Sequence, residues 1–121
     1  MASLLITSGA NKGNCYKLDK LPMSVGRDVQ RDIQIMDPKI SRKHFVLKKD
    51  AEGVILTASE AKNGVWVNGK KIEGETKLND SDRIIIGETE MTYLLNDDPA
   101  RVDAFNKMRQ LSPAARATTI I

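Results

Sequence analysis

The sequence predicts an all-β fold, and three observations carry that prediction. About ten short apolar runs follow one another at intervals of roughly 8–12 residues, as they do in a β-sandwich. Polar segments separate these runs, and two of the segments hold the turn-forming dipeptides Asn63-Gly64 and Asn68-Gly69. No convincing helical periodicity interrupts the series before Asn96. Together these features favour two antiparallel sheets packed face to face.

Five strands are expected in the first half of the chain. Cys15, the only cysteine, is expected to be a small buried strand residue rather than a reactive thiol. Pro22 separates the second strand from the third. Asp37-Pro38 forces a turn after the fourth, because the residue before a proline is pushed out of the helical region. The expected strands cover residues 4–7, 15–18, 23–25, 32–36 and 44–48.

The second half of the chain repeats this organisation as far as Leu95. The two Asn-Gly dipeptides stand on either side of the run 65–67, which is the signature of a compact hairpin. A polar turn over residues 78–82 precedes the next apolar run. The expected strands cover residues 54–57, 65–67, 70–72, 83–87 and 90–95.

The composition changes at Asn96, so the chain is divided into a sandwich over residues 1–96 and a tail over residues 97–121. Asp98 is a suitable N-cap, and Pro99 suits the first helical position, where its missing N–H costs nothing. The short helix that follows is interpreted as a lid on the sandwich or, alternatively, as a docking element for a partner. Its apolar stripe comprises Val102, Phe105, Met108 and Leu111, Ser112-Pro113 ends it, and residues 114–121 are expected to be mobile.

Composition sets limits on the partners. The net charge of +3 comes from 19 cationic and 16 anionic residues, a mixed surface that gives little reason to expect binding to nucleic acid or to a membrane. Residues 1–6 contain only a short apolar run, so a secretory signal or a membrane span has no support. We therefore expect a cytoplasmic protein.

Two loop signals, 25–28 and 40–44, mark the candidate functional site. The first places Arg27 at the end of an apolar run, and the second places Ser41, two cations and His44 just before another. A guanidinium and a hydroxyl brought together near backbone N–H groups can hold a phosphate dianion. Alternatively, Arg27 is a surface residue that pairs with Asp28 or Asp32, and Ser41 caps the turn after Pro38.

His44 is the only histidine and is expected to brace the loop rather than to act in catalysis. No second histidine or cysteine is available to build a metal site or a nucleophilic pair. The sequence therefore predicts neither an enzyme nor a bound metal or cofactor.

Four motifs follow one another along the chain: Gly26-Arg27, Ser41-Arg42-Lys43-His44, Lys62-Asn63-Gly64 and Val67-Asn68-Gly69. Their order and rough spacing resemble those of the forkhead-associated (FHA) domain. The segment 78–87 also looks like the part of that family that precedes its final strands. The resemblance covers residues 3–95 and implies an eleven-stranded antiparallel β-sandwich of the SMAD/FHA type whose loops bind a phosphothreonine peptide.

The resemblance also implies a role for each site residue. Arg27 would pair with the phosphate, Ser41 would donate its hydroxyl to it, and Arg42 would contact phosphate or peptide backbone. Lys62 would help to hold the phosphate, and Asn63 would bond the main chain of the ligand. The residues expected to support the site are Gly26, His44, Gly64, Asn68 and Gly69.

Two positions depart from the family pattern. Ala61 stands where a serine often precedes the lysine-asparagine pair, and Val65 replaces a common threonine. Lys62 could offset the lost hydroxyl with added charge, although its bonding is less directional. These changes bear on ligand selectivity more than on binding itself.

The leading hypothesis is a non-catalytic phosphothreonine-binding module that recruits phosphorylated partners in kinase-dependent signalling. The alternative is a phosphate-independent scaffold for protein assembly. The tail adds a further hypothesis, because Ile121 lies three residues after Thr118 and this family often selects ligands by the residue at that spacing. A phosphorylated Thr118 could then occupy the pocket of its own chain or of a neighbour; the alternative is an end with no role.

Overall fold

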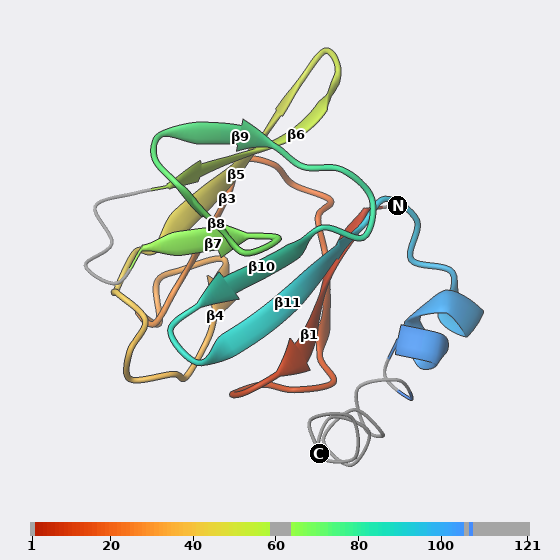
Figure 1. Ribbon diagram of the computed structural model, residues 1–121, viewed down its shortest axis with the longest axis horizontal. Coiled ribbons are helices and arrows are strands. Elements are labelled where there is room, and N and C mark those ends of the chain that lie inside the picture. The colour runs from red at the N-terminus through yellow and green to blue at the C-terminus, as the bar shows by residue number, and fades with distance from the viewer. Residues whose placement is uncertain (1, 59–63, 106, 108–121) are drawn as a thin grey trace.

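The computed structural model describes residues 2–58, 64–105 and 107, and within them it contains eleven strands in two sheets (Figure 1). The six-stranded sheet has the order β2-β1-β11-β10-β7-β8 and the five-stranded sheet the order β4-β3-β5-β6-β9. The predicted β-sandwich is confirmed. The strands are β1 (Ser3–Ser8), β2 (Cys15–Lys17), β3 (Met23–Gly26), β4 (Ile33–Gln34), β5 (Phe45–Asp50), β6 (Gly53–Ala58), β7 (Val65–Val67), β8 (Lys70–Ile72), β9 (Glu75–Lys77), β10 (Arg83–Ile86) and β11 (Thr89–Leu94).

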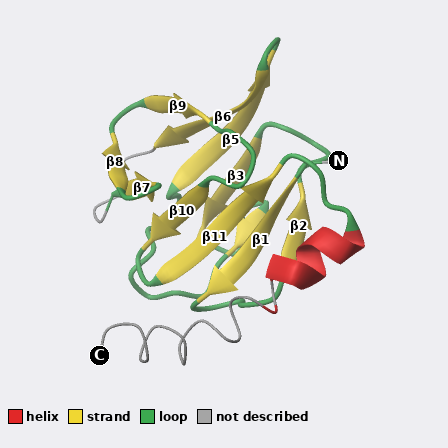
Figure 2. Ribbon diagram, turned by 45° about the vertical axis from the view of Figure 1, so that its right-hand side comes forward, coloured by secondary structure: helices red, strands yellow, loops and turns green. Residues whose placement is uncertain are grey.

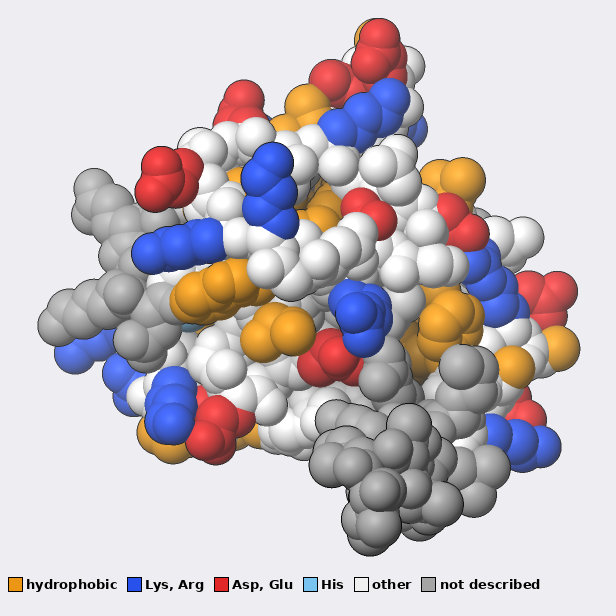
Figure 3. All heavy atoms as spheres, in the orientation of Figure 1, with side chains coloured by type: hydrophobic (Ala, Val, Ile, Leu, Met, Phe, Trp, Pro, Cys, Tyr) orange, Lys and Arg blue, Asp and Glu red, His pale blue; other side chains and the backbone are white. Residues whose placement is uncertain are grey.

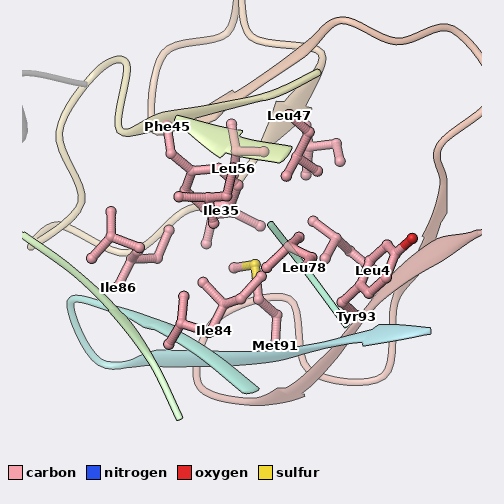
Figure 4. Packing of buried hydrophobic residues seen from close by; sticks show 14 of the residues in the cluster. Leu4, Ile35, Phe45, Leu47, Leu56, Leu78, Ile84, Ile86, Met91 and Tyr93 are labelled. Carbon is pink, nitrogen blue, oxygen red and sulfur yellow. The ribbon is translucent and has the colours of Figure 1, made fainter. Parts of the chain in front are cut away.

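The core lies between the two sheets and follows the alternation of apolar residues along the strands. Phe45 and Leu47 of β5 and Leu56 of β6 face Ile84 of β10 and Met91 of β11 across this space (Figure 4). All five side chains are fully buried. Because one rigid core joins both sheets, the loops at its ends are held in fixed relative positions.

Two features of the sheets differ from the expectation. β9 was not predicted, because Glu75-Thr76-Lys77 offers no apolar alternation; it pairs with β6, with Thr76 opposite Leu56. β3 and β4 pair in parallel, whereas an antiparallel arrangement was expected throughout. The loop between β3 and β4 therefore turns back along β3. The carboxylate of Asp32 fixes this loop against β3, because it accepts hydrogen bonds from the backbone N–H (2.8 Å) and the hydroxyl (3.1 Å) of Ser24.

The expectation that Cys15 is buried was wrong. Cys15 begins β2, the edge strand of the six-stranded sheet, and its side chain is exposed. It pairs with Leu5 rather than with the inward-facing Leu4, so it lies on the face of the sheet that turns away from the core. The apolar pattern of the run could not show which strand would be at the edge.

The short helix begins where the sequence predicted. Asp98 accepts a hydrogen bond of 2.9 Å from the backbone N–H of Ala100, and residues 99–105 are helical. In Figure 2 this helix lies beside β2. Val102 and Phe105 are half-buried, while Met108, Leu111 and residues 112–121 lie outside the described residues.

Polar contacts attach this helix to the sandwich. Arg101 pairs with Asp80 and donates a hydrogen bond of 3.0 Å to the hydroxyl of Ser81, both in the turn before β10. The hydrogen bond from Arg101 lowers the pKa of Asp80. Ser3 donates to the carboxylate of Asp97 over 2.9 Å. These contacts attach residues 97–101 to the sandwich, and the choice between a lid and a docking element stays a prediction.

The described surface carries charges of both signs. Figure 3 shows lysine, arginine and acidic side chains interspersed over one face of the molecule, with apolar side chains between them. Within the described part of the chain, no helix has the length and apolar character needed to cross a membrane.

Candidate phosphate-binding site

Backbone hydrogen bonds bring the two predicted loop signals together. The backbone N–H of Arg27 donates to the carbonyl of Ser41 (3.0 Å), and that of Asp28 donates to the carbonyl of Arg42 (3.2 Å). These bonds join the two loops just beyond the ends of β3 and β5, which pair with each other in the sheet. Arg27 and Ser41, fourteen positions apart in the sequence, therefore share one rim of the sandwich.

Gly26 permits this close approach. A Cβ atom at Gly26 would lie 2.1 Å from the carbonyl oxygen of Arg42, far inside van der Waals contact. Any side chain at this position would push the two loops apart. The glycine before Arg27 is thus required by the proximity of the Arg42 backbone.

The guanidinium of Arg27 is exposed and is anchored at one nitrogen. Its Nε donates a hydrogen bond of 3.1 Å to the carbonyl of Ile40, just before Ser41. Neither carboxylate proposed as an alternative partner forms an ion pair with it among the described residues. Asp32 binds Ser24, and Asp28 accepts from the backbone N–H of Gln30 over 3.2 Å. Among the described residues, the remaining nitrogens of Arg27 form no ion pair or hydrogen bond and can therefore bind a ligand.

An open pocket of about 260 Å³ lies at this rim. The described residues that line it are Arg27, Asp28 and Arg42, so two arginines and one aspartate border the same space. Ser41 adjoins Arg27 through the backbone and does not line the pocket. The arrangement offers a concentration of cationic hydrogen-bond donors suited to a phosphate group.

His44 joins the Ser41 loop to the segment before β7. Its ring is fully buried, and Nδ1 accepts a hydrogen bond of 3.0 Å from the backbone N–H of Ser41. A backbone N–H can only donate, so Nδ1 carries no proton. Nε2 is therefore protonated and donates to the carbonyl of Gly64 over 2.7 Å. The ring is held as one neutral tautomer, and burial lowers the pKa of His44.

Gly64 is the only member of the third motif that the structure describes; Ala61, Lys62 and Asn63 lie outside the described residues. Gly64 has φ of +74°, a conformation that side chains disfavour. The next residue, Val65, is fully buried in β7, so its departure from the family pattern affects packing.

Asp37 holds the Ser41 loop from its other side, a role that the sequence interpretation missed. Its carboxylate accepts hydrogen bonds from the backbone N–H of Lys39 (2.8 Å), the backbone N–H of Glu88 (2.7 Å) and the hydroxyl of Thr89 (2.9 Å). Burial by itself raises the pKa of Asp37, but these hydrogen bonds outweigh it and lower the pKa below its usual value. Ile40 also donates its N–H to the Asp37 carbonyl over 3.0 Å.

Asp37 therefore caps the turn that contains Pro38. Capping this turn was the alternative role considered for Ser41. The signal was present in Asp37-Pro38, since an aspartate often binds backbone N–H groups a few residues further on. The contacts to the β10–β11 turn depend on the tertiary structure and have no local signature.

Asn68 and Gly69, expected to support the site, form the tight turn between β7 and β8. Both have positive φ, +52° and +84°. The amide of Asn68 donates to Asp82 and accepts from the backbone N–H of Arg83, each over 2.9 Å. These contacts hold the start of β10 in place. They lie after the last residue of β7, whereas Gly64 lies before its first residue, and none of them reaches the rim that carries Arg27.

The residues that the structure describes contain no group of three or more His, Cys, Asp or Glu side chains placed to hold a metal ion.

Comparison with known proteins places this geometry in a family. A family model described as the inner membrane component of T3SS, cytoplasmic domain, matches residues 5–97. The chain is 30% identical over 95 residues to the glycogen accumulation regulator GarA of Mycobacterium tuberculosis, an alignment that covers 77% of this chain and 57% of GarA. The chain spans less than two thirds of the length of the curated relatives it matches.

Solved structures match in fold. A structure from work on phosphothreonine-dependent FHA domain interactions superposes with a TM-score of 0.72 at 25% identity, covering 80% of this chain and 98% of that one. Mycobacterium tuberculosis EmbR, in complex with a low affinity phosphopeptide, superposes with a TM-score of 0.74 at 27% identity, covering 80% of this chain and 25% of that one. The chain belongs to the family of the cytoplasmic domain of the T3SS inner membrane component, and its fold is that of the forkhead-associated domain.

Proposed function

We propose that this chain is a non-catalytic module that binds a phosphothreonine-containing segment of a partner protein in kinase-dependent signalling. One observation supports the proposal: backbone hydrogen bonds join the β3–β4 and β4–β5 loops, and Arg27 and Arg42, one from each loop, border one open pocket. The relatives support it, since GarA is named as a regulator and EmbR has been solved with a phosphopeptide.

The chemistry of the ligand matches the pocket. A phosphothreonine carries a charge of about −1.5 to −2 near neutral pH and three acceptor oxygens. Arg27 pairs with these oxygens and Arg42 adds a second cation. Ser41 lies next to the pocket at the same rim, and its hydroxyl donates to a phosphate oxygen that extends beyond the lining residues. Lys62 and Asn63 complete the proposed set through the phosphate and the ligand main chain.

Discrimination follows from what an unmodified threonine lacks. Without the phosphate, Arg27 and Arg42 have no anion to bind, and a carboxylate mimic supplies too few oxygens and too little charge. Because His44 and Asp37 already hold the Ser41 loop, little ordering of the loop is needed on binding.

The test is a screen of phosphothreonine peptides and their unphosphorylated forms against the wild type, Arg27→Ala and Arg83→Ala. Arg83 is the matched control, because it lies on β10 next to Asn68 and away from the pocket. We expect binding only to phosphorylated peptides, a loss of roughly 2–3 kcal/mol in Arg27→Ala and little change in Arg83→Ala. Equal binding of both peptide forms would refute the proposal.

A second candidate is a phosphate-independent assembly module, which is favoured by the match to a family described as a component of T3SS. Under this function, a partner protein would bind equally well before and after phosphatase treatment, and Arg27→Ala would bind it as the wild type does.

We also propose a cytoplasmic location, supported by the description of the matching family as a cytoplasmic domain. Self-association through a phosphorylated Thr118, which lies outside the described residues, stays a prediction. Comparing the sizes of kinase-treated full-length and truncated protein by light scattering tests it, and unchanged size together with unchanged peptide affinity would exclude it.

A further inference from the structure

The pocket contains an acidic group that phosphate recognition does not explain. Asp28 lines it together with Arg27 and Arg42, and a carboxylate at this place repels a phosphate dianion. A site devoted to phosphate alone would be better served by a neutral residue there.

Asp28 is held firmly in this position. Its backbone N–H donates to the carbonyl of Arg42 (3.2 Å), and its own carbonyl accepts from the backbone N–H of Arg31 (3.0 Å), which closes a turn. One carboxylate oxygen, Oδ1, accepts from the backbone N–H of Gln30 over 3.2 Å. The side chain is half-buried, so the turn and the loop pairing together fix where its charge lies.

No cation of the described chain neutralises this carboxylate. Arg27 precedes it, Arg31 follows three residues later and Arg42 borders the same pocket. None of these comes within ion-pair distance of it among the described residues, and Arg27 instead binds Ile40. The Oδ2 atom of Asp28 is therefore available to a cation that comes from elsewhere.

We propose that Asp28 selects phosphothreonine ligands that carry a lysine or arginine close to the phosphorylated residue. This inference rests on the proposed function and specifies its ligand class. The phosphate binds the two guanidinium groups while the basic side chain of the ligand pairs with Asp28. Adjacent residues of an extended peptide are about 3.3 Å apart, so a cation within about three residues of the phosphothreonine can reach across a pocket of this size.

A basic residue beside the phosphothreonine would also offset the repulsion between the phosphate and the carboxylate of Asp28.

The alternative role of Asp28 is only to cap its turn through Oδ1. The substitution Asp28→Asn separates the two roles, because the asparagine side-chain oxygen still accepts from Gln30 while the charge is removed. Asp19→Asn is the matched control, since Asp19 is exposed, lies before β3 and does not line the pocket.

The experiment compares phosphothreonine peptides that differ only in having Lys, Ala or Glu at each position within about three residues of the phosphothreonine. Affinities for the wild type, Asp28→Asn and Asp19→Asn are measured at low and at high salt. At one or more positions we expect the wild type and Asp19→Asn to bind the Lys peptide about two- to five-fold more tightly than the Ala peptide, the range for a solvent-exposed ion pair. The Glu peptide should bind more weakly still, and high salt should reduce these differences.

In Asp28→Asn the preference for Lys should disappear, while the Ala peptide should bind at least as tightly as it does to the wild type. If phosphorylated peptides bind the wild type without any preference for Lys, this inference is wrong and the proposed function stands. A Lys preference that persists in Asp28→Asn also overturns the inference. If no phosphorylated peptide binds, both the inference and the proposed function fall.

Discussion

The backbone N–H of Ser41 donates a hydrogen bond of 3.0 Å to Nδ1 of His44, and this contact ties the candidate phosphate site to the core of the sandwich. The same ring donates through Nε2 to Gly64, the residue that follows Lys62 and Asn63 in the sequence. One buried imidazole thus connects two of the motifs that the sequence placed far apart. The first two predictions follow from this connection.

Replacing His44 with alanine should destabilise the fold and weaken phosphopeptide binding together. The substitution leaves the N–H of Ser41 and the carbonyl of Gly64 without their partner and opens a cavity, which should cost about 2–4 kcal/mol of unfolding free energy. Urea denaturation measures this loss. Lys43→Ala, one position earlier and exposed, is the control and should change stability by less than about 0.5 kcal/mol. Equal stability of both variants would show that the ring is dispensable.

The stability of the protein should fall in mildly acidic solution. The folded protein holds His44 neutral with a lowered pKa, whereas the unfolded chain binds a proton near pH 6.5. The stabilising contribution is therefore fully present above about pH 6.5 and is lost as the pH falls through the lower pKa of the folded state. Urea midpoints measured between about pH 7.5 and 5 should decline for the wild type. A decline of the same size in a variant that lacks His44 would assign the effect to another group.

Gly26→Ala should separate the two loops that form the pocket. The added methyl group would meet the Arg42 carbonyl, so the loops must move apart at a cost of about 1–3 kcal/mol or more. Phosphopeptide affinity should fall with stability, because Arg27 and Arg42 no longer face one pocket. Gly69→Ala is the comparison: it meets no neighbouring atom and disturbs only a positive φ far from the rim, so it should leave peptide affinity unchanged. A full-affinity Gly26→Ala variant would contradict this account.

Asp37→Ala should loosen the Ser41 loop from the β10–β11 turn. Three donors lose their acceptor, two of them belonging to Glu88 and Thr89, and the expected cost is about 2–4 kcal/mol. Thermal unfolding and hydrogen exchange of the Glu88 amide report this change. Asp50→Ala is the control. Asp50 lies at the end of β5 and, among the described residues, accepts hydrogen bonds only from the backbone N–H groups of its own turn, so its loss should cost less stability than that of Asp37.

The pH dependence of Asp37 is distinct from that of His44. Its folded-state pKa lies below 3.8, so its contribution is present above that value and is lost only as the pH falls through the lowered pKa. Acid titration should therefore show two separated losses of stability, and Asp37→Ala should remove the one at lower pH.

Much of the fold could be predicted from local patterns. Alternating apolar residues located ten of the strands, and Asp98-Pro99 located the start of the helix. β9 was missed because it contains no apolar residue whose burial would mark it. Cys15 was placed in the core because an apolar run does not reveal that its strand lies at the edge of a sheet.

The sequence by itself determined which residue types stand in the loops and therefore what they can bind: guanidinium groups at 27 and 42, a hydroxyl at 41 and one imidazole at 44. Only the tertiary structure decided that these loops form one rim, that Asp37 caps the loop that carries Ser41, and that Asp28 lies in the pocket without a cationic partner among the described residues. The physical reason is the range of the interactions. Turns and strands arise from neighbours along the chain, whereas the pocket depends on hydrogen bonds between backbone groups that are many positions apart, and these form only when the core brings both sheets together.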